Sequence, residues 1–138
     1  THNPKYIKEM VKWNEIYPVV IGSRHMRKNS IETWPFLRRT LTSIAYFVTK
    51  NFLNINFDAT SGFRSYNLKM ISQDIFNDIK SRSYSFFVET SFVLNKKLIV
   101  KTVPIDMPIR FAEKSKMKIN DMLSTIFLII KLFFKRLS

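Results

Sequence analysis

A polar segment between two apolar runs brings together three residues that could do chemistry: Asp58, Gly62 and Arg64. The carboxylate can accept a proton or orient a ligand, and the guanidinium can bind an anion through several donors. The chain of 138 residues contains two glycines, Gly22 and Gly62, and each lies two residues before an arginine. In a chain this poor in glycine, these positions predict turns with unusual φ or a close approach to a ligand. The segment therefore predicts a site.

Asp58 is the first candidate for a general base, or for a group that orients the attacking atom. The alternative is structural, because Asp before Thr-Ser-Gly is also a common turn composition. Arg24 follows a short apolar run that ends at Gly22, and its planar fork of donors could clamp a diphosphate. Its alternative is an ordinary solvated loop arginine, since basic loops are common in a chain this charged.

Two further pairs of residues could serve a site. Arg38 and Thr42 are four residues apart, so on a helix they share a face and could hold a phosphate monoester. Spacing alone favours the simpler interpretation, in which both residues lie on the solvent-exposed face of an amphipathic helix. Glu89 stands within an apolar run, where an unpaired charge would be costly to bury, so it should pair with Arg64 or Arg110. A structural ion pair and a catalytic carboxylate remain equal alternatives for Glu89.

A basic stretch after the last predicted strand contains Arg110, Ser115 and Lys116. It has little regular apolar pattern, and such a loop can close over bound phosphates. The alternative is a charged linker to the final helix. His2 and His25 are isolated in the sequence, and no His, Asp or Glu spacing has the pattern of a metal site.

The composition limits the class of protein. A hydrophobic content of 46% over 138 residues is enough for one domain with a core, and the absence of cysteine excludes disulfides and thiolate chemistry. The formal net charge of +13 would attract nucleic acid, anionic lipid head groups or nucleotide-sugar diphosphates. The first residues lack a signal-peptide pattern. We expect them to come from the middle of a longer protein.

The apolar periodicity predicts alternating helices and strands. The expected elements in chain order are a helix from Asn3-Pro4 to about residue 13, strand 17–21 of a mainly parallel sheet, mobile loop 25–33, helix 34–53, helix 67–79 capped by Asn67, a mostly helical segment 84–94 with Glu89 facing the site, and strand 97–103. An α/β fold follows, with Arg24 at the carboxyl edge of the sheet, where ligands bind in open α/β sheets.

The tail, residues 119–138, holds a dense apolar run flanked by lysines and an arginine. The run is shorter than the ~20 apolar residues that span a bilayer. It predicts an interfacial helix whose basic ends meet lipid phosphates. The alternative is an ordinary core or partner-packing helix.

Taken in order, these motifs resemble the C-terminal half of a family 2 glycosyltransferase of the dolichol-phosphate mannose synthase type. The resemblance covers about residues 1–117 and rests on Gly22-Ser23-Arg24, Trp34-Pro35 with Arg38-Arg39, Asp58-x-x-Ser61-Gly62-Phe63-Arg64, Glu89, Pro104-Ile105, Arg110 and Ser115-Lys116-Met117. Thr42 stands where the family often has Ser, and Glu113 stands where the loop usually has Gly.

The resemblance implies an incomplete GT-A fold over residues 1–118, followed by a terminal amphipathic helix at the membrane over residues 119–138. It implies transfer of a sugar from a nucleotide-diphosphate sugar to a polyprenyl phosphate, in a membrane-associated enzyme at the cytoplasmic face. The matching positions imply catalytic Asp58 and Glu89, donor diphosphate-binding Arg24, Arg110 and Lys116, and acceptor phosphate-binding Arg38, Thr42 and Arg64.

The family's metal-binding Asp-x-Asp motif would end just before residue 1. The resemblance therefore implies Mg²⁺ or Mn²⁺ in the full-length enzyme, no metal on this chain alone, and no catalysis without the missing N-terminal half. A basic nucleic-acid-binding module is the alternative, supported by charge and by an aromatic content of 14%. A membrane-bound, non-catalytic fragment that pairs with a separate N-terminal chain is a third interpretation. Most of the aromatics lie in apolar runs, which favours a glycosyltransferase without a nucleic-acid partner.

Overall fold

A three-stranded sheet is the framework of the chain, for which the computed structural model describes residues 2–107 and 119–137. The central strand β1 (Val19–Ser23) pairs in parallel with β3 (Val100–Pro104) and antiparallel with β2 (Arg64–Tyr66). The strand order is therefore β2-β1-β3. The predicted α/β class is confirmed, while the mainly parallel arrangement holds for one of these two pairings.

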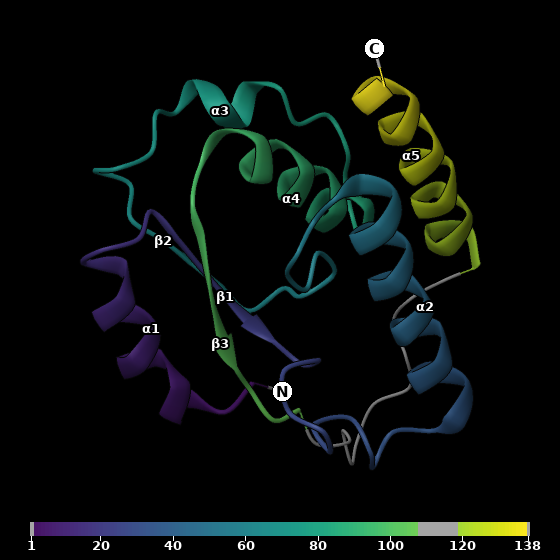
Figure 1. Cartoon of the computed structure of the whole chain (residues 1–138), viewed down its shortest axis with the longest axis horizontal. Coiled ribbons are helices and arrows are strands. Elements are labelled where there is room, and N and C mark those ends of the chain that lie inside the picture. Colours follow the sequence, from purple (N-terminus) through teal and green to yellow (C-terminus); the bar gives the residue numbers. More distant parts are fainter. Residues whose placement is uncertain (1, 108–118, 138) are drawn as a thin grey trace.

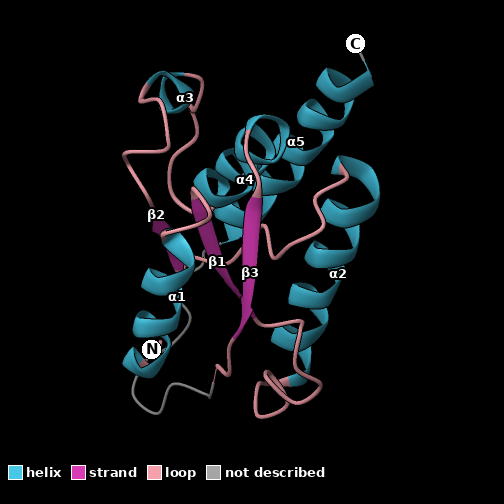
Figure 2. Cartoon of the chain, turned by 60° about the vertical axis from the view of Figure 1, so that its left-hand side comes forward, coloured by secondary structure: helices cyan, strands magenta, loops and turns pink. Residues whose placement is uncertain are grey.

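Helices lie on both sides of the sheet (Figures 1 and 2). They are α1 (Ile7–Asn14), α2 (Phe36–Leu53), α3 (Asp74–Asn77), α4 (Ser85–Lys97) and α5 (Ile119–Leu137). Helix α1 covers one face and α4 covers the other; α5 packs against α4, and α2 packs against α5 (Figure 2). This arrangement leaves one long side of both α2 and α5 at the surface.

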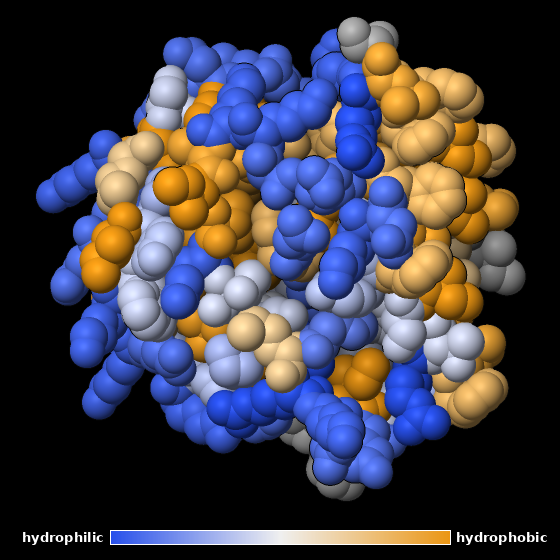
Figure 3. Space-filling view, viewed as in Figure 1, coloured by the Kyte–Doolittle hydropathy of each residue, from blue (hydrophilic) through white to orange (hydrophobic). Residues whose placement is uncertain are grey.

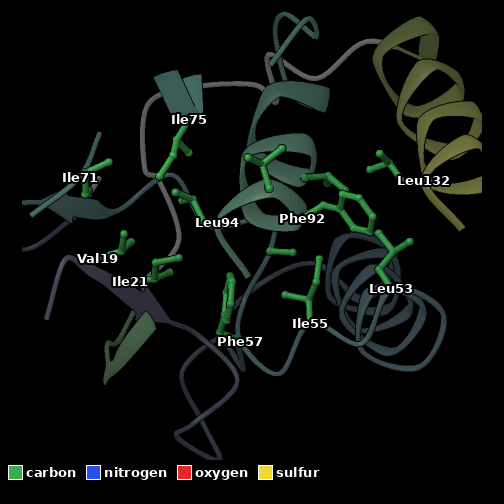
Figure 4. Packing of buried hydrophobic residues seen from close by; sticks show 13 residues of the cluster. Val19, Ile21, Leu53, Ile55, Phe57, Ile71, Ile75, Phe92, Leu94 and Leu132 are labelled. Atoms are coloured by element: carbon green, nitrogen blue, oxygen red, sulfur yellow. The ribbon is translucent and has the colours of Figure 1, made fainter. Parts of the chain in front are cut away.

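The alternation of side chains along β1 divides the core in two. Val19 and Ile21 point to the α4 side, where they join a large apolar cluster that includes Leu94 (Figure 4). Val20 points to the other side and packs with Met10 of α1. All three β1 residues are fully buried, as expected for a strand that is covered on both faces.

The first helix begins as the sequence predicts. Asn3 is the N-cap, and its side-chain oxygen accepts a hydrogen bond of 3.0 Å from the backbone N–H of Lys5. Pro4 follows at the first helical position, where a missing N–H does no harm. A short 3₁₀ turn, Pro4–Tyr6, then leads into α1.

Helix α2 begins at Phe36, directly after Pro35, and ends at Leu53. Asn54 stops it in the left-handed conformation, with φ of 56°, which asparagine tolerates better than most residues. The predicted helix 34–53 is thus confirmed to within two residues.

The predicted helix 67–79 is wrong, because only α3 (Asp74–Asn77) is helical there. The side chain of Asn67 accepts from the backbone N–H of Lys69 in a local turn and donates to the carbonyl of Asn14. Such side-chain bonds compete with helix formation, and apolar spacing does not reveal them. Strand β2 was not predicted, because its three residues show no apolar alternation.

Three other boundaries and one loop differ from expectation. The strands begin two or three residues later than predicted, and α4 extends through Lys97. The segment 25–33 was predicted to be a mobile loop, but it is tied to the end of β3. The hydroxyl of Ser30 donates to the carbonyl of Ile105 at 2.6 Å, and the backbone N–H of Met107 donates to Ser30.

Helix α5 occupies the predicted tail. Leu132 is buried against the core, and Leu128 and Ile129 pack partly on it, while apolar side chains on another side of the helix are exposed. Within residues 2–107 and 119–137, the structure contains no helix with the length and apolar character needed to traverse a bilayer.

Neither glycine has the positive φ that the sequence suggested, and both instead allow close packing. A Cβ on Gly22 would lie 2.9 Å from Cδ1 of Phe63 and 3.0 Å from Cδ1 of Ile105. A Cβ on Gly62 would lie 3.2 Å from the ring of Phe87. The close approach is therefore to this chain's own side chains.

We expect Gly22→Ala to lower the free energy of unfolding by about 1–3 kcal/mol, because Ile105 is buried and has no room to move. Gly62→Ala is the matched control and should cost less, since only the far end of one side chain must shift. Urea denaturation of both variants measures the difference. Equal stabilities for the two variants would contradict this account of Gly22.

Candidate functional site

The end of β1 and the loop after α2 meet in a buried ion pair between Arg24 and Asp58. Arg24 Nε lies 2.8 Å from Asp58 Oδ2, and Nη2 lies 2.8 Å from Oδ1. The arginine and aspartate side chains are 10% and 1% exposed. This two-pronged pairing is the strong, directional form of an arginine–carboxylate contact. Two of the candidate site residues named from the sequence, Arg24 and Asp58, therefore contact each other directly.

Thr60 completes the network around this carboxylate. Its hydroxyl donates to Asp58 Oδ1 at 3.0 Å and accepts from Arg24 Nη2 at 2.6 Å. Its backbone N–H donates to the same carboxylate oxygen at 3.3 Å, so Asp58 also forms the turn that was the structural alternative. The bonds to Asp58 and Thr60 use Nε and Nη2 of Arg24, which leaves Nη1 outside this network.

The ion pair keeps Asp58 charged. Burial on its own would raise the pKa of Asp58, but the hydrogen bond and positive charge of Arg24 outweigh it and hold that pKa below its ordinary value. A carboxylate with a lowered pKa and occupied oxygens is a weak proton acceptor. The geometry therefore favours Asp58 as the group that orients Arg24 over Asp58 as a general base.

His25 lies against the same pair, although the sequence marked it as isolated. Its ring stacks on Tyr46 of α2 with centroids 4.2 Å apart, and Nε2 lies 4.0 Å from Asp58 Oδ2. Burial lowers the pKa of His25, and the charge of Asp58 opposes this only in part. We therefore expect a neutral imidazole at pH 7.

A cavity of 560 Å³ opens beside the ion pair. It is lined by Arg24, His25, Arg27, Lys28, Ile31, Arg39, Thr40, Ser43, Ile44 and Phe47. Four of these residues are cationic and two carry hydroxyl groups, whereas no carboxylate is among the described lining residues. The hydroxyls and the last two apolar side chains come from α2. The cavity is thus suited to an anion attached to an apolar group.

The cavity is lined by the arginine of α2 that follows the predicted one, and the acceptor role of Arg38 and Thr42 stays a prediction. Arg39 and Ser43 line the cavity, one residue beyond the expected pair Arg38 and Thr42. The guanidinium of Arg38 lies 3.9 Å from the centroid of the buried Trp34 ring. Both pairs have the same four-residue spacing, so the sequence could have included Arg39 but could not choose between them.

Arg64 holds the loop in place and does not line this cavity. Its Nε donates to the carbonyl of Ser61 at 2.6 Å, and Nη2 donates to the carbonyls of Ala59 and Phe87 and to the hydroxyl of Ser91. The acceptor-phosphate role predicted for Arg64 is therefore not supported by its position. Burial lowers the pKa of this arginine, which nevertheless stays protonated at neutral pH.

Glu89 does not make the predicted pair with Arg64. Its carboxylate accepts from the backbone N–H groups of Lys80 and Ser81 at 2.9 and 2.6 Å. Phe87 and Ser91, which contact Arg64, stand two residues to either side of Glu89 on α4, and two residues rotate a helix by roughly 200°. Glu89 thus faces away from Arg64 and fastens the preceding loop.

Two predicted donor-site residues, Arg110 and Lys116, fall within 108–118, outside the described residues. Across the part of the chain that the structure describes, no group of three or more His, Asp or Glu side chains could hold a metal ion. The divalent cation expected for a longer enzyme therefore stays a prediction.

Known proteins extend these observations. No protein-family model matches the chain. An undecaprenyl-phosphate mannosyltransferase of Micrococcus luteus is 25% identical over 118 residues, which cover 83% of this chain and 46% of that protein. A polyprenol monophosphomannose synthase of Mycolicibacterium smegmatis is 25% identical over 111 residues, which cover 79% of this chain and 42% of that protein.

The resemblance to dolichol-phosphate mannose synthase-like glycosyltransferases is thus confirmed. An uncharacterized protein of Methanocaldococcus jannaschii is also similar, at 33% identity over 113 residues, which cover 75% of this chain and 44% of that protein. The chain spans less than half the length of these curated relatives. The small mixed sheet is consistent with part of a GT-A domain.

We expect Asp58→Asn to destabilise the chain by about 3–5 kcal/mol, because it leaves the Arg24 charge buried without its partner. The native pair is stabilising above the ordinary aspartate pKa of ~3.9 and loses its effect as pH falls through the lower folded pKa. Urea denaturation between pH 7 and pH 3 should therefore show a smaller acid dependence for the variant.

The exposed Asp74, whose side chain accepts only from Ser72 among the described bonds, provides the control. Asp74→Asn should retain near-native stability at pH 7. If Asp58→Asn were as stable as Asp74→Asn, the pair would not organise the site.

Proposed function

We propose that this chain is part of a glycosyltransferase that passes a sugar from a nucleotide-diphosphate sugar to a polyprenyl phosphate. The cavity beside the Arg24–Asp58 pair is the observation that carries this proposal. The cavity combines four cationic residues with an apolar wall. The chain is similar to an undecaprenyl-phosphate mannosyltransferase and to a polyprenol monophosphomannose synthase. We assign this cavity to the phosphate of the acceptor.

The polar half of the cavity fits a phosphate. The guanidinium of Arg39 can offer a planar pair of donors, Nη1 of Arg24 lies outside the Asp58 network, and Lys28 adds a point charge. The hydroxyls of Thr40 and Ser43 stand on the same helix and can donate to further phosphate oxygens. A phosphate monoester carries close to two charges at neutral pH, so several cations are needed to neutralise it.

The apolar half distinguishes the acceptor from other phosphates. Ile44 and Phe47 follow Thr40 and Ser43 along α2, so they are one turn further from the phosphate-binding end of the helix. A hydrocarbon attached to the phosphate could lie over them. A nucleic acid has no such chain, and the alternative of a nucleic-acid-binding module is not supported by the relatives.

The reaction does not require Asp58 to act as a base. The second pKa of a phosphate monoester is about 6, so an ionised oxygen is already available for attack at pH 7. That oxygen forms a bond to the anomeric carbon of the sugar, while the bond from this carbon to the diphosphate oxygen breaks. The nucleoside diphosphate leaves with the bonding electrons, and nearby cations stabilise the charge that develops.

Within this scheme Asp58 fixes the direction of Arg24 at the acceptor cavity, and the donor-diphosphate role expected for Arg24 from the sequence stays a prediction. We infer that the nucleotide and a divalent cation, Mg²⁺ or Mn²⁺, bind largely to residues outside this chain, since the relatives are more than twice as long as the matched part. Action at the cytoplasmic face of a membrane stays a prediction.

Binding of farnesyl phosphate, a short polyprenyl phosphate, tests the acceptor site. Arg39→Ala should weaken it by roughly 10- to 100-fold, the range expected for losing hydrogen bonds to a charged group. Arg82→Ala is the matched control, because it removes one positive charge at an exposed position outside the cavity. Isothermal titration calorimetry or NMR titration measures both affinities.

Arg38→Ala tests the sequence-based choice of arginine, and it should affect binding less than Arg39→Ala. Equal losses for Arg39→Ala and Arg82→Ala would show that only net charge matters and would overturn the assignment. Inorganic phosphate serves as a second ligand, and the apolar wall predicts that it binds more weakly than farnesyl phosphate.

A further inference from the structure

His25 follows Arg24 after strand β1, and its ring is held between the end of this strand and α2. The ring stacks on Tyr46 of α2 with planes 18° from parallel, and the side chain is 12% exposed. The backbone N–H of His25 donates to the hydroxyl of Ser23 at 3.3 Å. Both backbone and ring are fastened, so the imidazole has a defined direction beside the cavity that it lines.

One nitrogen of this ring is buried without a hydrogen bond. Nε2 of His25 has no hydrogen-bond partner within the described residues, and Asp58 Oδ2, at 4.0 Å, is beyond hydrogen-bonding distance. The oxygens of Asp58 accept instead from Arg24 and Thr60. A buried polar atom without a partner destabilises a fold. Next to a cavity, such an atom is a candidate for a role that a ligand completes.

The charges around the ring come from several parts of the chain. The cationic residues of the cavity are Arg24 after β1, Arg27 and Lys28 in the next loop, and Arg39 on α2. The loop after β1 lies at the lower edge of Figure 1, and hydrophilic side chains cover the same edge in Figure 3. The titratable groups against the ring itself are Asp58, from the loop after α2, and the stacked Tyr46.

These surroundings make the ring neutral when no anion is bound. Burial lowers the pKa of His25, the charge of Asp58 raises it in part, and the charge of Arg24 lowers it further. The ring is therefore a proton acceptor that stands among cations, with a carboxylate close by.

We propose that His25 senses the charge of the bound phosphate, because it takes up a proton when a doubly charged phosphate enters the cavity and releases it when the phosphate leaves. The proposal rests on the proposed function, which assigns a phosphate monoester to this cavity. The proton comes from solvent and binds the ring nitrogen that carries none, so no other bond forms or breaks. The imidazolium has two N–H donors, and it can direct one to the phosphate and one to Asp58.

A bound dianion reverses the electrostatic balance at the ring. An opposite charge within about 4–6 Å favours the protonated form of an imidazole, and it also offsets the nearby cations. The face of the Tyr46 ring suits this form as well, since aromatic faces attract cations. Protonation of His25 and binding of the phosphate must then strengthen each other, because the coupling between two bound species is reciprocal.

This coupling would distinguish the substrate of the proposed reaction from its product. A phosphate monoester carries close to two charges at pH 7, whereas the phosphodiester formed by sugar transfer carries one. A singly charged ligand supports the imidazolium less, so the product would be held less tightly than the acceptor. His25 is thus a specificity-determining residue that responds to the charge of the ligand.

NMR of the native chain tests the uptake of the proton directly. The chain has two histidines, so the ring signals of His25 and His2 can be resolved and followed with pH. Without a ligand, burial should keep the pKa of His25 below the ordinary histidine value. Saturating inorganic sulfate or farnesyl phosphate should move the His25 titration to higher pH. His2 stacks on Phe63 and is not among the lining residues, so its titration should move much less.

The pH dependence of sulfate affinity is the second measurement, made by isothermal titration calorimetry. Sulfate keeps two charges from pH 5.5 to pH 8, so the ligand itself does not titrate. The native chain should bind it at least roughly tenfold more tightly at pH 5.5 than at pH 8, the smallest effect expected of a nearby opposite charge. His25→Phe can keep a ring against Tyr46 but cannot take up a proton, so its affinity should change little. His2→Phe is the matched control and should retain the native pH dependence.

The outcomes separate this inference from the proposed function. An unmoved His25 titration, or the same pH dependence for the native chain and His25→Phe, would overturn the role of His25. Weaker farnesyl phosphate binding by Arg39→Ala would then still support the acceptor cavity. If neither sulfate nor farnesyl phosphate binds the native chain, both proposals are wrong. Circular dichroism and thermal unfolding check that His25→Phe is folded, and the NMR titration decides the question without any variant.

Discussion

The buried ion pair between Arg24 and Asp58 is the interaction on which the site depends. Arg24 follows the central strand, and Asp58 lies in the loop that returns from α2. The pair therefore sets the position of α2 relative to the sheet, and with it the shape of the cavity between them. Because both partners are almost completely enclosed, neither charge can be satisfied by water if the pair is broken.

Three arginines near this pair illustrate how geometry separates similar residues. Arg64 donates hydrogen bonds to carbonyl and hydroxyl oxygens of the chain, and so it stabilises the loop around Asp58. Arg24 is shared, with part of its fork on Asp58 and part outside that network. Arg39 stands at the cavity wall on α2. The same functional group thus stabilises a loop, forms a buried ion pair or lines the cavity, according to the partners that the fold provides.

Helix α2 lines the cavity and also reaches the molecular surface. One turn of this helix presents cations and hydroxyls, and the next presents Ile44 and Phe47 to both the cavity and the surface. An amphiphilic ligand matches this gradient, because its phosphate needs charge and its hydrocarbon needs an apolar medium. An amphiphilic ligand would thus meet charge at one turn of α2 and apolar side chains at the next.

The sequence by itself determined the α/β class, most helices, the central strand and the proximity of Arg24 to Asp58. The elements follow from local properties: the apolar run of β1, the Asn3-Pro4 helix start, and the apolar patterns of α2 and α4. The tail helix α5 could also be predicted locally, because the dense apolar run of residues 122–134 is long enough for a helix.

Tertiary structure alone decided the helix phase, the partners of charged residues and the boundaries. Arg38 and Arg39 have the same four-residue spacing to a hydroxyl in the sequence, but in the fold Arg38 lies over the Trp34 ring and Arg39 lines the cavity. Glu89 meets the backbone of residues 80 and 81, Asn67 forms a turn, and the polar strand β2 pairs with β1. Each outcome depends on a partner distant in space or on a side-chain bond to the backbone, and hydrophobic periodicity contains neither.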